Sequence, residues 1–206
     1  MSTSALDLAP VVPVVIVDDV ESAVPLARAL VAGGLPAVEV TLRTPAALGA
    51  IERIAAEVEG AFVGAGTVLT PDQAKAAADA GARFLVTPGC TETLYGALLD
   101  TGLSFLPGTS TVSEVLRLRE LGVREMKFFP AEAAGGAPYL KSLASPVPDV
   151  RFCPTGGITP ASAPNYLALP NVACVGGSWM LPADAVASGD WSRVERLARE
   201  ASGLRG

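Results

Sequence analysis

The sequence contains no histidine, and only three of its 15 basic residues are lysines. The missing imidazole excludes zinc sites built on histidine, and it leaves acid–base chemistry to carboxylate, amine, phenol and thiol groups or to water. A reaction that needs a lysine amine has three candidates, which are Lys75, Lys127 and Lys141.

Cysteine and positive charge are also scarce. Cys90, Cys153 and Cys174 are odd in number and far apart, so they fit neither a disulfide framework nor a CxxC metal site, and we expect them to be reduced. The chain has 21 acidic and 15 basic residues, a net charge of −6, and no basic cluster that could follow a phosphate backbone. We therefore expect no nucleic-acid partner.

Apolar runs are too short to cross a membrane. The longest run near the N-terminus, Val11–Val17, is far shorter than the roughly 18 residues of a spanning helix, and two aspartates follow it. The segment Met1–Pro10 has no basic residue and includes Asp7, unlike a signal peptide. The sequence thus predicts a cytoplasmic protein without a membrane partner.

Short apolar or β-branched runs alternate with helical patterns along the chain. The predicted strands are Val11–Val17, Ala37–Leu42, Phe62–Val68, Phe84–Thr87, Ser104–Leu106, Glu125–Phe129, Arg151–Cys153 and Val172–Val175. The helical patterns between them are Glu21–Ala32, Pro45–Val58, Pro71–Ala80, Glu92–Asp100, Val112–Leu121, Pro138–Leu143 and Ala161–Leu167. Threonine–proline pairs predict capped helix starts at Thr44-Pro45, Thr70-Pro71 and Thr159-Pro160.

This pattern predicts the fold. Nearly continuous apolar strands, each followed by a helix, are typical of a parallel sheet covered by helices. Eight such units predict a single-domain (β/α)8 barrel over residues 1–206, close to the lower size limit of about 200 residues. A doubly wound open sheet is the alternative, but no glycine-rich dinucleotide fingerprint follows the first strand. We expect two C-terminal helices at about 182–204, the second amphipathic.

One lysine lies in an unusual place. Lys127 belongs to the apolar run Glu125–Phe129, where an unpaired ammonium is costly. Side chains alternate along strands, so Glu39 and Arg43 share one face, and Glu39 can meet Lys127 if both faces point inward. A carboxylate beside a desolvated amine suits proton transfer and attack on carbonyl compounds, and Arg43 could clamp a carboxylate. The alternative is a buried ion pair without chemistry.

Glycine pairs follow the last two predicted strands. Gly156-Gly157 and Gly176-Gly177 stand where barrels often bind phosphate through backbone N–H groups, and Ser178 adds a donor. Each pair alone is typical of an ordinary tight turn, because glycine is the usual turn residue. Their occurrence on adjacent strands favours a phosphate site.

Six longer blocks resemble one enzyme family. They are EVTLRT (39–44), VGAGTV (63–68), PGTSTVSE (107–114), KFFPAE (127–132), RFCPTGGI (151–158) and GGSW (176–179). These blocks resemble the 2-dehydro-3-deoxy-6-phosphogluconate (KDPG) aldolases, which are grouped with the 4-hydroxy-2-oxoglutarate (KHG) aldolases. The resemblance runs from about Val11 to the C-terminal helix. It implies a homotrimeric (β/α)8 barrel with class I aldolase chemistry that needs no metal and no cofactor.

The resemblance also implies roles for residues at the carbonyl end of the substrate. By it, Lys127 would form the Schiff base and Glu39 would transfer protons. Arg43 and Thr67 would bind the carboxylate of the pyruvate portion. Thr109 stands where an aliphatic residue is expected, and no functional conclusion follows from that difference.

At the other end of the substrate the resemblance implies a phosphate site and a specificity pocket. Thr155 would lie near the C4 hydroxyl and influence the stereochemical choice. The residues that would line the pocket are Phe129 and Pro88. The residues that would receive the phosphate are Gly156, Gly157, Gly177 and Ser178.

The reaction implied is reversible cleavage of KDPG to pyruvate and glyceraldehyde 3-phosphate. The expected partners are these small molecules and further copies of the chain. Within the family, the epimeric 6-phosphogalactonate compound and KHG are alternative substrates. A non-catalytic sugar-phosphate-binding barrel is an alternative of another class, which the Lys127 and Glu39 pair disfavours. A metal-dependent aldolase is disfavoured by the lack of histidine.

Overall fold

The computed structural model describes residues 4–204, so both ends of the predicted 1–206 domain lie outside the described residues. The strands are β1 (Val11–Val15), β2 (Ala37–Thr41), β3 (Phe62–Gly66), β4 (Phe84–Val86), β5 (Ser104–Leu106), β6 (Gly108–Thr109), β7 (Glu125–Phe128), β8 (Arg151–Pro154) and β9 (Val175–Gly177). The α-helices are α1 (Ala23–Ala32), α2 (Ala47–Glu57), α3 (Pro71–Asp79), α4 (Glu92–Asp100), α5 (Val112–Glu120), α6 (Gly136–Leu143), α7 (Ala163–Leu167), α8 (Ala183–Ser188) and α9 (Trp191–Ser202). The 3-10 helices η1 (Ala5–Asp7) and η2 (Val20–Ser22) precede β1 and α1.

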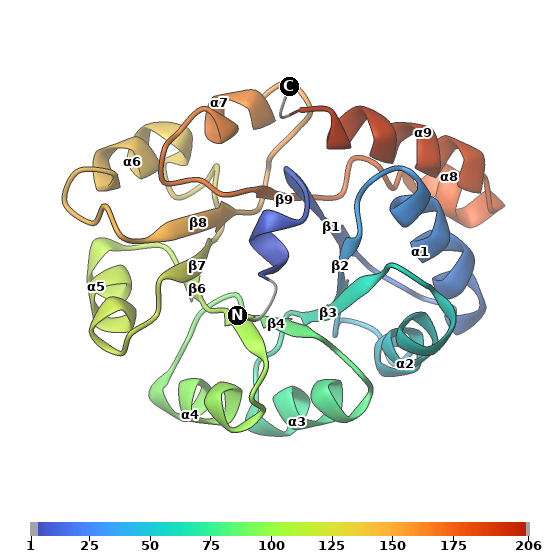
Figure 1. Ribbon diagram of the computed structural model, residues 1–206, viewed down its shortest axis with the longest axis horizontal. Coiled ribbons are helices and arrows are strands. Elements are labelled where there is room, and N and C mark those ends of the chain that lie inside the picture. The colour runs from blue at the N-terminus through green and yellow to red at the C-terminus, as the bar shows by residue number, and fades with distance from the viewer. Residues whose placement is uncertain (1–3, 205–206) are drawn as a thin grey trace.

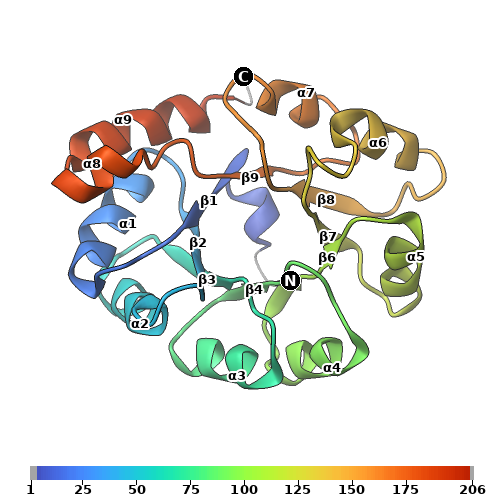
Figure 2. The same cartoon turned by 180° about the vertical axis from the view of Figure 1, so that it is seen from behind.

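All pairings between these strands are parallel. They form a six-stranded sheet in the order β5-β4-β3-β2-β1-β9 and a three-stranded sheet in the order β6-β7-β8. Figures 1 and 2 show the strands around the centre of the molecule, with the α-helices on the outside. The predicted parallel sheet covered by helices is therefore confirmed.

One predicted strand is displaced, and one observed strand was not predicted. The fifth predicted strand, Ser104–Leu106, is confirmed as β5, and β6 follows it after Pro107, which has no N–H to donate, although its carbonyl accepts from the Lys127 amide at 3.0 Å. The predicted strand Val172–Val175 is displaced, because regular pairing with β1 begins only at Val175 and continues through two glycines. Val172 forms an isolated bridge with Phe152. Glycine is depleted in strands, so the pairing of Gly176 and Gly177 with β1 was not predicted.

One of the three predicted threonine caps is confirmed. Thr70 Oγ1 accepts from the amide of Gln73, at 3.2 Å, at the start of α3. The prediction at Thr44 was wrong, because its hydroxyl donates to Val17 O and α2 begins only after Ala46. The prediction at Thr159 was also wrong, because this residue closes a turn before α7. Thr44 therefore bonds to the loop after β1, and Thr159 bonds to Ser162 within its own turn.

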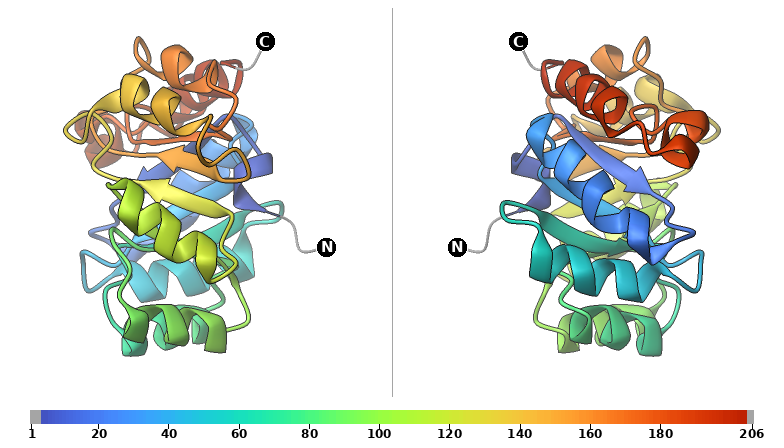
Figure 3. Two further views of the ribbon diagram at one scale, coloured as in Figure 1. Left: turned by 90° about the vertical axis from the view of Figure 1, so that its left-hand side faces the viewer. Right: turned by 90° about the vertical axis from the view of Figure 1, so that its right-hand side faces the viewer.

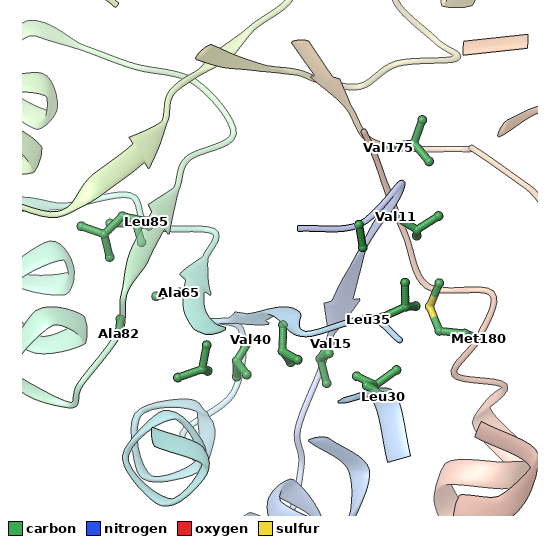
Figure 4. Close-up of a cluster of buried hydrophobic side chains, with 14 of the residues drawn as sticks. Val11, Val15, Leu30, Leu35, Val40, Ala65, Ala82, Leu85, Val175 and Met180 are labelled. Carbon is green, nitrogen blue, oxygen red and sulfur yellow. The ribbon is translucent and has the colours of Figure 1, made fainter. Parts of the chain in front are cut away.

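The main core lies between the strands and the outer helices. Figure 4 shows Val15 of β1, Val40 of β2 and Leu30 of α1 within it, all of them buried. α9 completes this layer by packing against α1, with Val194 and Ala198 buried as its predicted amphipathic face requires. No helix within residues 4–204 is long and apolar enough to cross a membrane.

A second, smaller core closes one end of the strands. η1 inserts Ala5 and Leu6 among inward-facing side chains that include Phe84, Leu106 and Cys174. Figure 1 shows this short helix in the middle of the strands, and Figure 3 places the N-terminal end of the described chain on one side of them. We call η1 the plug. It was not predicted, because a helix of three residues is too short to show a hydrophobic period.

Polar contacts hold the plug in place. Arg151, at the start of β8, pairs with Asp7 of η1 at 2.8 Å and also with Glu125. Ser4 Oγ donates to Glu125 Oε2 at 2.7 Å. Because Glu125 and Arg151 begin their strands, the plug seals the amino-terminal end of the strands and leaves their carboxyl ends for a site.

We expect Leu6→Ala to lower the free energy of unfolding by about 2–5 kcal/mol, because Leu6 is 0% exposed and its removal leaves a cavity. Urea denaturation followed by circular dichroism measures the loss. Leu99→Ala is the matched control, since Leu99 is 52% exposed and should change stability by no more than about 0.5 kcal/mol. Equal losses in the two variants would contradict the structural role of the plug.

Candidate active site

The centre of the candidate site is a buried ion pair. Lys127 Nζ of β7 lies 3.3 Å from Glu39 Oε1 of β2, and the two residues are only 3% and 2% exposed. Both strands therefore turn these faces inward, as side-chain alternation predicts. The Lys127 ammonium also lies 5.3 Å from the centre of the Phe129 ring, within the range of a cation–π contact.

Alternation along β2 places Glu39 at a defined depth. Ala37 faces inward into the core beside η1, while Val38 and Val40 face outward toward the helices. Glu39 thus stands one inward position above the plug, and Thr41 stands one further toward the carboxyl end. The apolar core around η1 therefore covers the ion pair on the amino-terminal side of the strands.

Glycines of β3 make room for side chains that face the interior. A Cβ atom at Gly66 would lie 2.2 Å from Glu39 Oε1, and one at Gly64, which pairs in register with Glu39, would lie 2.4 Å from Phe84 Cε1. Sequence reasoning gave no role to these two glycines. Their signal is the small-residue block VGAGTV, in which Gly64 and Gly66 face the interior.

The carboxyl ends of β2 and β3 bring a guanidinium and a hydroxyl together. Arg43 Nε donates to Thr67 Oγ1 at 3.3 Å. Thr67 has a φ of +57°, which is strained for a β-branched residue. Within residues 4–204 the other guanidinium N–H groups of Arg43 form no hydrogen bond, so they are available to an anion.

The loop after β8 forms a tight glycine turn. Gly156 has a φ of +105° and Gly157 a φ of +80°, a backbone region that side chains rarely adopt. Thr155, just before the turn, is buried and bridges to Gly176, where a Cβ atom would lie 2.2 Å from Thr155 Oγ1. This bridge brings the turn and the end of β9 side by side.

The remaining predicted residues lie at the rim. Gly177 is the buried last residue of β9, and Ser178 directly after it is exposed. Ser178 also lines a groove of about 520 Å³ with Asp18 and Asp19. Pro88 is half-buried against Gly108, which pairs in register with Lys127.

Tyr166 and Glu132 form a contact that sequence reasoning missed. The buried Tyr166 hydroxyl of α7 donates to Glu132 Oε1 at 2.7 Å. Burial, together with the neighbouring carboxylate, raises the pKa of the Tyr166 phenol well above its usual value, so the hydroxyl keeps its proton. Glu132 is the last residue of the KFFPAE block, so the sequence does mark this position. Tyr166 lies 34 residues further along the chain, so the contact between them could not be predicted.

The arrangement supplies the groups that imine chemistry needs. An amine and a proton-transferring carboxylate lie at the centre, with a guanidinium on one side and a glycine turn on the other. Among residues 4–204, no three histidine, cysteine or carboxylate side chains are close enough to hold a metal ion. The fold and these groups define a candidate enzyme that joins a lysine to a carbonyl substrate.

Comparison with known proteins identifies the family. A sequence model of the KDPG and KHG aldolases matches residues 3–197. The KHG/KDPG aldolase of Escherichia coli K12 is 54% identical over 198 residues, which are 96% of this chain and 93% of that protein. The chain belongs to the KDPG and KHG aldolase family.

Solved structures agree with this result. The KDPG aldolase of Zymomonas mobilis has a TM-score of 0.92 at 50% identity, with 98% of this chain and 96% of that one covered. The KDPG aldolase of Legionella pneumophila, solved with pyruvate captured as a covalent carbinolamine, has a TM-score of 0.94 at 44% identity, with 97% of each chain covered.

We expect Gly66→Ala to lower aldolase turnover by about 100-fold, because the new methyl group displaces the Glu39 carboxylate from Lys127. Steady-state kinetics measure the loss. Gly96→Ala is the control, since a Cβ atom there meets nothing within 4 Å. Unchanged turnover in folded Gly66→Ala would show that the position of Glu39 does not matter.

Proposed function

We propose that this chain is a class I aldolase that reversibly cleaves KDPG to pyruvate and glyceraldehyde 3-phosphate. The buried contact between Lys127 and Glu39, in a member of the aldolase family, is the observation that carries the proposal. The pyruvate carbinolamine in the Legionella structure supports the same chemistry in a relative.

The Lys127 ammonium first gives a proton to Glu39 or to water and so becomes a free amine. It attacks the C2 ketone to give a carbinolamine, and loss of water gives an iminium ion. Glu39, directly or through water, accepts the C4 hydroxyl proton while the electrons of the C3–C4 bond flow into the iminium. Glyceraldehyde 3-phosphate leaves, C3 of the enamine is protonated, and hydrolysis releases pyruvate and the free amine.

Binding of the two anionic ends must be local, because the protein carries a net charge of −6. Arg43 and Thr67 bind the carboxylate next to the reacting ketone, and their contact above Glu39 supports this assignment. Backbone N–H groups receive the phosphate at the residues Gly156, Gly157, Gly177 and Ser178. The bridge from Thr155 to Gly176 supports a shared phosphate site.

Three residues complete the substrate pocket in this proposal. Thr155 lies near the C4 hydroxyl and influences which epimer reacts, an assignment supported by its place beside the glycine turn. Phe129 lines the pocket next to the amine, as its 5.3 Å distance from Lys127 Nζ suggests. Pro88 lines the same pocket from the loop after β4, against Gly108 of β6.

The proposal includes a closed eight-stranded barrel formed by one domain over residues 1–206. In it, β5 and β6 are one strand interrupted at Pro107, which supports continuity between the two sheets at one seam. The bridges Phe152 to Val172 and Thr155 to Gly176 support continuity at the other seam. A homotrimer follows from the family resemblance, and the cytoplasmic location stays a prediction.

KHG is a second substrate in this proposal. The Escherichia coli relative carries both substrate names, and KHG has the same ketone and carboxylate without a phosphate. The epimeric 6-phosphogalactonate compound is the remaining alternative within the family. Ratios of kcat/KM for the three substrates distinguish these assignments.

Borohydride reduction in the presence of pyruvate should attach a three-carbon label to Lys127 alone, because reduction traps the imine. Peptide mapping by mass spectrometry locates the label. Lys127→Ala should lose both label and turnover, whereas Lys141→Ala should keep both. A label on Lys75 or Lys141, or none at all, would overturn the assignment of the amine. Unchanged ligand affinity and turnover in Lys127→Ala would favour the alternative of a non-catalytic sugar-phosphate-binding barrel.

Treatment with a chelator should leave cleavage of KDPG unchanged, because the iminium ion performs the role that a metal has in other aldolases. The measurement compares turnover before and after dialysis against EDTA. Loss of activity that a divalent ion restores would identify a metal-dependent aldolase instead.

A further inference from the structure

The contact between Tyr166 and Glu132 has no part in the reaction steps above. Tyr166 is 1% exposed, and its hydroxyl donates to Glu132 Oε1 at 2.7 Å. A buried phenol that keeps its proton is a directional donor, so it holds the carboxylate in one orientation. The bond ties α7 to the segment that follows β7.

Glu132 lies directly against the glycine turn. A Cβ atom at Gly157 would be 2.8 Å from Glu132 Cγ. The Glu132 amide donates to Gly156 O at 3.1 Å, and the preceding amide, of Ala131, donates to Thr155 O at 2.8 Å. Both the backbone and the side chain of this segment therefore support the turn, and the turn can pack so closely only because it consists of glycine.

The Glu132 carboxylate also lies near the start of α6. A Cβ atom at Gly136 would lie 3.7 Å from Glu132 Oε2 and 3.3 Å from the Tyr166 hydroxyl. The carboxylate and the Tyr166 hydroxyl thus both lie beside the first residue of α6. A carboxylate free to rotate beside the turn would instead repel an anion bound there.

We propose that Tyr166 and Glu132 are positioning residues that keep the Gly156-Gly157 turn in the shape that binds the phosphate end of the substrate. They set the preference for phosphorylated over unphosphorylated substrates without touching the reacting atoms. The inference rests on the proposed function, because it needs the turn to be the phosphate site.

The test uses Tyr166→Phe, which keeps the ring and removes a single hydroxyl. We expect the KM for KDPG to rise about tenfold, the effect of losing one hydrogen bond to a charged group. The rate at which borohydride traps pyruvate on Lys127 should stay unchanged, because pyruvate has no phosphate. The kcat/KM for KHG should also stay unchanged.

Two further variants test the pair itself. Glu132→Ala should raise the KM for KDPG as much as Tyr166→Phe does, and the double variant should be no worse than either, because both remove one interaction. Glu132→Gln keeps an oxygen that can accept from Tyr166, so its KM should stay within about twofold of the wild type. Because Glu132 is exposed, its variants should fold, and they test the proposal even if Tyr166→Phe does not fold.

Tyr95→Phe is the matched control. It also loses one tyrosine hydroxyl, which donates to Leu121 O at 2.9 Å, but on α4 and away from the turn. It should change the KM for neither substrate. Equal losses with KDPG and with pyruvate in Tyr166→Phe, or no change in the KM for KDPG, would overturn the positioning role. A wild-type protein that traps pyruvate but does not cleave KDPG would instead refute the proposed function.

Discussion

The contact on which the rest of the site depends is the buried pair of Lys127 and Glu39. Two opposite charges that are almost fully removed from water are tolerable only together, because either one alone would be an unpaired charge in the interior. The pair joins β2 to β7, which belong to different sheets. Gly66 of β3 leaves the space that the Glu39 carboxylate occupies.

Glycine serves two separate purposes around this pair. In β3 and β9 it provides space, since a methyl group at Gly66 or Gly176 would collide with Glu39 or Thr155. After β8 it provides backbone freedom, since Gly156 and Gly157 both have positive φ angles. Larger side chains lie in the layer between strands and helices, around Val15, and in the inner core beside η1, around Phe84.

Much of this structure could be predicted from local patterns. Alternation in β2 and β7 was enough to bring Glu39 toward Lys127, and helix signals gave both ends of α4. Features that depend on distant partners were missed or misplaced. The hydroxyl of Thr44 bonds to a neighbouring loop instead of its helix, and Tyr166 meets a carboxylate 34 residues away. Neither partner is encoded in the residues nearby, so a period or a capping rule cannot find it.

The plug formed by η1 also determines how molecules reach the interior. Leu6 fills the amino-terminal end of the strands, and the pair of Arg151 and Asp7 fastens it there. In the proposed reaction, pyruvate stays attached to Lys127 next to this closed end, and the phosphorylated fragment lies toward the carboxyl ends of the strands. The proposed function therefore requires glyceraldehyde 3-phosphate to leave first and pyruvate last.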